Sequence, residues 1–189
     1  MTYEKIKSIV KKTLSEKRFR HTLGCAEAAV SLAKRWNADE DKALRAALLH
    51  DITKELPYEQ QLEIVKKIPF ALSDTEKSKN IIHAFSGAVT AREKFGESDE
   101  VCRAIMYHTT SCADMTTLDK IIWLSDLIEK NRDFPGVEEI RDAAEKDLSR
   151  ALILGYDRTI MYLIERGSPI NENVILARNS ELRESKKER

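Results

Sequence analysis

Apolar residues recur along this chain with the spacing of an α-helix, and this periodicity limits the fold more than any other feature. Only six glycines and four prolines interrupt the 189 residues, and the apolar–polar alternation that marks a β-strand is nearly absent. The first example is the stripe formed by Tyr3, Ile6, Val10 and Leu14. We therefore predict an all-α fold, a single-domain bundle whose amphipathic helices bury their apolar faces against one another.

Capping and turn-forming residues divide the chain into its predicted helices. Asn37 to Asp41 supplies a cap and first-turn acids, and Ser73-Asp74-Thr75-Glu76 has the pattern of another N-terminal cap. Phe134-Pro135-Gly136 predicts a turn. After the first stripe, the predicted helices cover about 18–36, a stretch that ends near Asp51, then 58–67, 81–95, 97–108, 116–130, 137–146 and 148–166, with a last one from about 173.

The domain organisation follows from what separates these helices. No internal repeat and no linker-like segment is present, so we expect a single domain over residues 1–189. Its core spans about 18–130, and the C-terminal helices of about 137–180 pack on that core. Residues 181–189 form a charged tail, which is best explained as a solvated terminus.

Charge and composition argue against several kinds of partner. The chain carries 32 basic and 32 acidic residues, so we expect no nucleic acid and no anionic membrane as partners. No apolar run approaches the length of a membrane span, and no signal peptide is predicted. Cys25, Cys102 and Cys112 form no Cys-x-x-Cys motif and indicate reduced thiols. A cytoplasmic location is therefore expected.

The chemistry of the chain centres on its histidines. His50-Asp51 ends an apolar helical run, and the last turn of a helix can direct both side chains toward one point. The other three histidines and one further aspartate also lie on or beside apolar stripes: His21, His83, His108 and Asp126. Converging polar groups on the interior side of helices need a common partner, and a divalent metal would supply one. Imidazole and carboxylate donors suit iron, manganese, zinc or nickel rather than a thiolate-type structural zinc.

Spacing by itself leaves a second interpretation open. A single histidine on an apolar stripe is more often a hydrogen-bonded core residue, and Asp126 could simply pair with a lysine or arginine. Cys25, one turn beyond His21, is better explained as a small buried residue than as a ligand. Trp123, one turn before Asp126, favours a core position over a base-stacking one.

The order of His21, then His50-Asp51, then Asp126 resembles the HD-domain phosphohydrolases. More narrowly, the chain resembles the YqeK-type HD-domain family. The segments that carry this resemblance span most of the chain: Arg18 to Gly24, His50 to Lys54, His83-Ala84, Tyr107 to Thr110, Asp126 to Val137, and Ala177 to Asn179. The block from Asp126 to Val137 discriminates best, because HD proteins in general share only the metal ligands. Asn171-Glu172-Asn173 departs from the family pattern.

The resemblance implies a metal-dependent enzyme that hydrolyses diadenosine tetraphosphate symmetrically to two ADP. Iron is the divalent metal that the resemblance leads us to expect. The implied metal ligands are His21, His50, Asp51 and Asp126, with Asp51 also orienting the attacking water. Two roles stay open for His83 and His108: contact with the phosphates, which we favour, or completion of a second metal site. Asp51, His83 and His108 are thus the expected catalytic residues.

The expected partner is a small nucleotide, and several polar residues beside the metal motif are expected to contact it. Lys54 and Arg132 would balance the polyphosphate charge. The full predicted set is Arg18, Thr53, Lys54, His83, His108, Thr109, Arg132 and Asp133. Two alternatives stay open: another HD-domain hydrolase of a nucleoside monophosphate, cyclic nucleotide or stringent-response nucleotide, or a non-catalytic nucleotide-sensing module. Surface stripes are compatible with a homodimer.

Overall fold

The computed structural model describes residues 1–187, and these form helices and connecting turns with no β-strand among them. The all-α prediction is confirmed. The predicted charged tail over 181–189 needs correction: residues 181–187 continue the last helix, and Glu181 is buried because it pairs with Lys120. Positions 188–189 lie outside the described residues. The elements are α1 (Tyr3–Thr13), α2 (Glu16–Arg35), α3 (Glu40–Leu49), α4 (Tyr58–Val65), α5 (Ile82–Thr90), the π-helical turn η1 (Ala91–Phe95), α6 (Asp99–Met106), α7 (Thr117–Ile128), α8 (Val137–Ala144), α9 (Leu148–Glu165) and α10 (Glu172–Lys187).

Short polar side chains start most of the long helices. Ser15 accepts a hydrogen bond from the third residue of α2, and Asp39 does the same for α3, as predicted from Asn37 to Asp41. Asp147 caps α9. Thr116 and Asp119 form a reciprocal capping box at the start of α7. These caps satisfy backbone donors that would otherwise lack partners, so the helices that carry the site begin at defined residues.

The structure differs in detail from two local predictions. Ser73 and Glu76 form the reciprocal bonds of a capping box, but turns follow them, and the next regular helix, α5, begins only at Ile82. The predicted helix over 81–95 is also not uniform. Its last turn, η1, has π-helical bonding and ends at Gly96, whose φ of 71° suits a residue without a Cβ atom. Apolar periodicity could not show either difference, because it does not report backbone hydrogen bonding.

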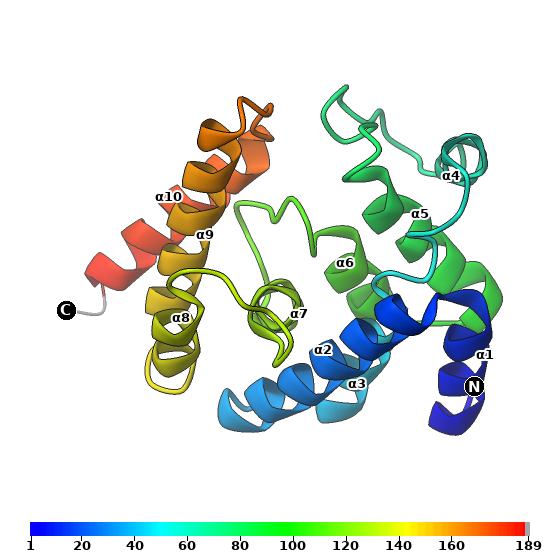
Figure 1. The fold of residues 1–189 in the computed structure, drawn as a ribbon, viewed down its shortest axis with the longest axis horizontal. Coiled ribbons are helices and arrows are strands. Elements are labelled where there is room, and N and C mark those ends of the chain that lie inside the picture. The colour runs from blue at the N-terminus through cyan, green and yellow to red at the C-terminus, as the bar shows by residue number, and fades with distance from the viewer. Residues whose placement is uncertain (188–189) are drawn as a thin grey trace.

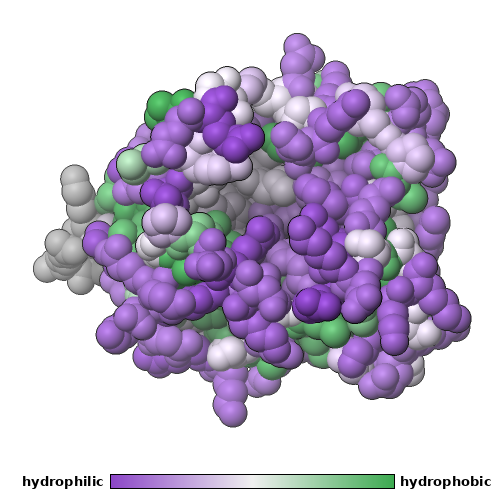
Figure 2. Space-filling model, in the orientation of Figure 1, coloured by the Kyte–Doolittle hydropathy of each residue, from purple (hydrophilic) through white to green (hydrophobic). Residues whose placement is uncertain are grey.

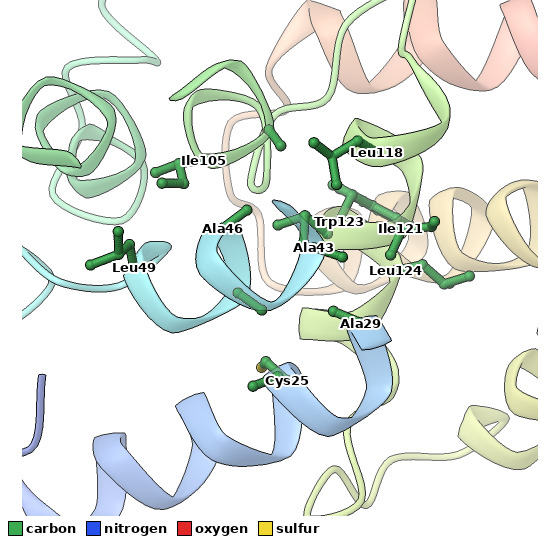
Figure 3. Packing of buried hydrophobic residues seen from close by; sticks show 14 of the residues in the cluster. Cys25, Ala29, Ala43, Ala46, Leu49, Ile105, Leu118, Ile121, Trp123 and Leu124 are labelled. Atoms are coloured by element: carbon green, nitrogen blue, oxygen red, sulfur yellow. The ribbon is translucent and has the colours of Figure 1, made fainter. Parts of the chain in front are cut away.

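Small residues let the central helices approach closely. Ala29 on α2 and Ala43, Ala46 and Ala47 on α3 are completely buried. Figure 3 shows Cys25 and Ala29 facing the alanines of α3, with α7 beside them. Because alanine side chains are small, the helix axes can lie close together, and polar side chains on α2, α3 and α7 can meet at one point.

The C-terminal helices form a second group against α7. In Figure 1, α8, α9 and α10 lie on one side of α7, and α4 and α5 lie on the other. Trp123 of α7 packs on Tyr156 of α9, with ring centroids 4.3 Å apart. A Cβ atom on Gly155 would lie 2.8 Å from Trp123 and from Leu127, so this close approach requires glycine. No helix in the described part of the chain is long and apolar enough to span a membrane.

Candidate metal centre and nucleotide cleft

Asp51 lies at the centre of the histidine cluster. His50 is the C-cap residue of α3, and Asp51 follows in the next turn, so both side chains point inward and are buried. The Asp51 carboxylate faces all four histidines. Its oxygens lie 3.3 Å from Nε2 of His50 and of His83, 3.8 Å from Nε2 of His21, and 3.9 Å from Nε2 of His108. The structure therefore brings together the polar residues that helical spacing singled out.

His21 and Asp126 close one side of this cluster. His21 lies within α2 and Asp126 in the last turn of α7, and the Nε2–Oδ1 distance is 3.0 Å. Donor atoms of His21, Cys25, His50 and Asp126 all lie within 4.8 Å of one another. Cys25 is buried as expected, but its Sγ also lies 3.4 Å from His21 Nε2. Burial, reinforced by the Asp126 and Glu129 charges, raises the pKa of the Cys25 thiol well above its ordinary value.

The residues at this cluster fit a divalent metal. Nδ1 of His50 lies 2.7 Å from the carbonyl oxygen of Ala47 and therefore carries the hydrogen, which leaves Nε2 bare. That Nε2 is buried and finds no hydrogen-bond partner among the described residues, although Asp51 Oδ2 lies 3.3 Å away. A buried imidazole lone pair with its other nitrogen anchored on a carbonyl is typical of metal ligands.

Two arginines pair with the two aspartates of the cluster. Arg18 Nη1 lies 2.9 Å from Asp51 Oδ2, and Arg132 Nη2 lies 2.5 Å from Asp126 Oδ1. Burial opposes ionisation of Asp51, but His50 and the other histidines outweigh it and hold its pKa well below the ordinary value. For Asp126, His21 and Arg132 likewise outweigh burial and lower the pKa. Both carboxylates are therefore ionised and available as ligands.

The opposite side of Asp51 carries a pair of histidines and a lysine. Nε2 of His83 lies 3.2 Å from Nε2 of His108, and Lys54 Nζ lies 3.1 Å from His83 Nδ1. Burial, followed by the charges of His108 and Lys54, lowers the pKa of His83 well below its ordinary value. Burial and His50 lower the pKa of His108 to about 4. Both rings are thus neutral near pH 7.

The remaining predicted contact residues occupy different surroundings. Thr53 is buried, and its hydroxyl donates to the His83 carbonyl oxygen at 3.0 Å and contacts Ser86 at 2.7 Å, so it holds α5 in place. Thr109 follows His108, and its hydroxyl finds no hydrogen-bond partner within the described residues. Thr109 and Asp133 line a cavity, whereas Thr53 does not.

This cavity of about 600 Å³ opens beside the metal cluster, within the size range of small-molecule sites. Figure 2 shows the molecule hollowed on the face between α9 and α5, with a mostly hydrophilic rim. The helices α7 and α9 and the loop between α7 and α8 contribute most of the cavity wall. Its lining residues are His108, Thr109, Trp123, Asp126, Leu127, Asn131, Arg132, Asp133, Phe134, Arg158, Thr159 and Tyr162.

Sequence reasoning missed the contribution of α9. Arg158, Thr159 and Tyr162 lie on an ordinary amphipathic helix, and only its packing against α7 brings them to the cavity. Trp123 is buried in the core as expected and also forms part of the cavity wall. The loop after α7 is held by Arg141 of α8, whose guanidinium donates to the carbonyl oxygens of residues 128, 129 and 132. No local sequence pattern predicted these hydrogen bonds of Arg141.

Comparison with known proteins identifies the family to which this chain belongs. The profile described as HD domain matches residues 18–131, so the chain belongs to the HD-domain family. The chain is 38% identical over 182 residues to the symmetrical bis(5'-nucleosyl)-tetraphosphatase of Bacillus subtilis, which covers 95% of this chain and 97% of that protein. The protein of the same name from Halalkalibacterium halodurans is 37% identical over 187 residues, covering 98% and 100%.

A solved structure has the same fold as this chain. It is the crystal structure of a predicted HD superfamily hydrolase involved in NAD metabolism from Clostridium acetobutylicum. The TM-score is 0.92 at 38% identity, covering 97% of this chain and 98% of that one. Within the HD-domain family, the chain belongs to the symmetrical bis(5'-nucleosyl)-tetraphosphatases, the YqeK-type family that the sequence resembled. It is therefore a hydrolase of phosphoric anhydrides, and the predicted enzyme class is confirmed.

Proposed function

We propose that this enzyme cleaves diadenosine tetraphosphate symmetrically to two ADP at the cluster centred on Asp51. The observation that carries the proposal is the junction between that cluster and the cavity, since Asp126 and His108 belong to both. A polyphosphate at the cluster can therefore extend a nucleoside into the cavity. The names of the full-length relatives support this substrate.

The proposed metal ligands are His21, His50, Asp51 and Asp126. A divalent ion bound there would supply Lewis-acid polarisation of a phosphoryl oxygen and a more acidic bound water. Iron is the proposed ion, and manganese, nickel or zinc would also suit imidazole and carboxylate donors. Asp51 accepts a hydrogen bond from the attacking water and orients it toward an inner phosphorus. A bond forms from the water oxygen to that phosphorus, and the bond to the central bridging oxygen breaks.

The leaving ADP takes the electron pair of the broken bond, the attacked half also departs as ADP, and the proton that the water loses is released to solvent. Lys54, Arg18 and Arg132 balance the negative charge of the phosphates, as charge-assisted hydrogen bonds to phosphate require. His83 and His108 are proposed to contact phosphate oxygens. Lys54 lies 3.1 Å from His83, and this positive charge disfavours a second cation there.

One nucleoside is proposed to occupy the cavity. Phe134 and Tyr162 offer aromatic surface to its base, and Arg158 offers a cation near the ribose and phosphate. Thr109 and Asp133 supply a hydroxyl and a carboxylate on the same wall. The wall thus combines aromatic surface for the base with charged and polar groups for the ribose and phosphate.

Product analysis tests the proposal. The metal-loaded enzyme is incubated with diadenosine tetraphosphate, and anion-exchange chromatography should find ADP as the sole product. AMP together with ATP would contradict symmetrical cleavage. Faster turnover of a nucleoside monophosphate, a cyclic nucleotide or a stringent-response nucleotide would favour another HD hydrolase. Tight nucleotide binding without turnover on any divalent metal would favour a sensing module.

Location and assembly form a separate part of the proposal. Cys25, Cys102 and Cys112 are free thiols, which fits a reducing cytoplasm. The proposed partners are the small nucleotide and, in a homodimer, a second copy of the chain. Light scattering tests the dimer: a mass of twice 21.6 kDa supports it, and a mass of 21.6 kDa contradicts it.

A further inference from the structure

Glu129 is a buried carboxylate that does not belong to the proposed metal ligands. It is the C-cap residue of α7 and is only 2% exposed. A buried carboxylate is costly unless hydrogen bonds satisfy both of its oxygens. Oε1 lies 3.2 Å from Nδ1 of His21, and Oε2 accepts from the backbone N–H of Asn131 at 2.8 Å and from its side-chain amide at 2.7 Å. Both oxygens are therefore occupied.

The contact with His21 sets which ring nitrogen carries a hydrogen. An ionised carboxylate can only accept, so the hydrogen shared by the two side chains lies on Nδ1. Nε2, on the other side of the ring, faces Asp126 at 3.0 Å and Asp51 at 3.8 Å, where a bound metal ion would take its lone pair while Nδ1 keeps the hydrogen.

Gly24 provides the space that this carboxylate occupies. It lies in α2 one turn beyond His21, where glycine weakens a helix. A Cβ atom at this position would lie 2.3 Å from Glu129 Oε2 and 3.3 Å from the Asn131 side-chain nitrogen. Such a contact would force the carboxylate away from its place. The helix thus carries glycine where a side chain would displace the partner of His21.

We propose that Glu129 is a positioning residue for the metal centre, which fixes the tautomer and ring plane of His21, and that Gly24 and Asn131 hold Glu129 in register. This inference rests on the proposed metal site. The geometry separates Glu129 from the ligands, because the His21 ring lies between it and Asp126. Partners of this kind around metal-bound imidazoles typically change metal affinity about 10- to 100-fold when they are removed.

Metal titration tests the inference without relying on turnover. Metal-free protein is titrated with Co²⁺ while its visible absorption is recorded, because these bands report ligand geometry. Glu129→Gln should bind Co²⁺ about 10- to 100-fold more weakly and show altered bands. Gly24→Ala should shift both readouts the same way although it retains the carboxylate. In a Glu129→Ala background, Gly24→Ala should cause little further loss, because the carboxylate oxygen that its Cβ atom would strike at 2.3 Å is gone.

The matched control is Glu181→Gln. Glu181 lies on α10, away from the cluster, and is a carboxylate of similar burial. It pairs with Lys120 and Ser149. It should lose thermal stability while binding Co²⁺ as the unmodified protein does. If Glu129→Gln and Gly24→Ala both bind Co²⁺ with unchanged affinity and bands, the inference fails and the proposed metal site stands. If the unmodified protein binds no Co²⁺, the proposed site itself fails. Should Glu129→Gln not fold, unchanged binding by Gly24→Ala is enough to overturn the inference.

Discussion

The two sides of Asp51 carry the same kind of side chain in opposite electrostatic surroundings. On one side, His21 lies between the carboxylates of Asp126 and Glu129. On the other, His83 lies against the ammonium group of Lys54. Histidine alone therefore does not define a metal site, and the charge of the neighbouring side chains determines whether a cation can bind. In the proposed mechanism, the carboxylate side would attract a cation, whereas the lysine side would attract the phosphates of the substrate.

The pKa values follow the same division. Although burial lowers the pKa of His50, the negative charge of Asp51 outweighs burial and raises the pKa above the ordinary value. His83 and His108 are shifted the other way, chiefly by burial. His108 does anchor its Nδ1 on the carbonyl oxygen of Ile105, as a metal ligand would. The contrast between the two sides thus depends most on Lys54, which makes that residue the most informative one to change.

Removing the shared centre should have the largest effect. His50→Ala or Asp51→Ala should lower kcat/KM more than about 10³-fold, because a bound metal contributes several kcal/mol to such a transition state. Circular dichroism should show the helical content retained. Both activity and bound metal are measured on the same samples. Turnover that persists in either variant would remove the cluster from the mechanism.

Changing Lys54 should have the next largest effect. Lys54→Met should raise KM about 10-fold or more, because a charge-assisted phosphate contact is lost. Lys54→Glu is a more drastic change, since it places a carboxylate beside His83, as Asp126 and Glu129 are placed beside His21. We expect that variant to bind a second equivalent of divalent metal, which isothermal titration measures. Unchanged KM in Lys54→Met would show that the lysine does not meet the phosphates.

The stability of the metal-free protein should depend on pH through His108. The folded protein keeps His108 neutral down to about pH 4, whereas in the unfolded chain it takes up a proton near pH 6.5. Between these values the unfolded state binds more protons, so this residue lowers the free energy of unfolding as pH falls.

Urea titrations measure this dependence directly. Relative to His108→Gln, the unmodified protein should lose about 1.4 kcal/mol per pH unit within that window. The comparison isolates His108 from His50, whose shifted pKa acts in the opposite direction. Equal slopes for the two proteins would show that His108 titrates normally.

Cys25→Ala should have the smallest effect. The thiol is buried beside His21, but its raised pKa keeps it protonated and outside the proposed ligand set. Metal affinity and kcat should therefore stay close to those of the unmodified enzyme. A large drop in metal affinity would instead make Cys25 a ligand and would add a soft donor to the carboxylate side.

Helical periodicity located the polar residues of the cluster but not their partners. It identified His21, His50 and Asp126 because each interrupts an apolar stripe on its own helix. Such a pattern does not tell which helices meet, so the α9 wall with Arg158 and Tyr162 was not predicted. The chain-wide resemblance supplied the family, and that prediction is confirmed.

Glu129 shows a second reason why the sequence did not predict the whole site. It sits just after the last turn of α7 in a charged stretch, where a solvent-exposed carboxylate is the ordinary expectation. Its burial depends on Gly24, which is distant in sequence and belongs to another helix. Only the packing of α2 against the end of α7 brings the two together. The Ser73 to Glu76 turn is the opposite case, where the local capping pattern formed but no helix followed.

Metal content is the most direct test of the contrast between the two sides of Asp51. Protein purified without added metal is analysed by inductively coupled plasma mass spectrometry, alongside His50→Ala and His83→Ala. The account predicts one equivalent per chain in the unmodified protein, none in His50→Ala and one in His83→Ala. Two equivalents in the unmodified protein, or loss of metal in His83→Ala, would contradict it.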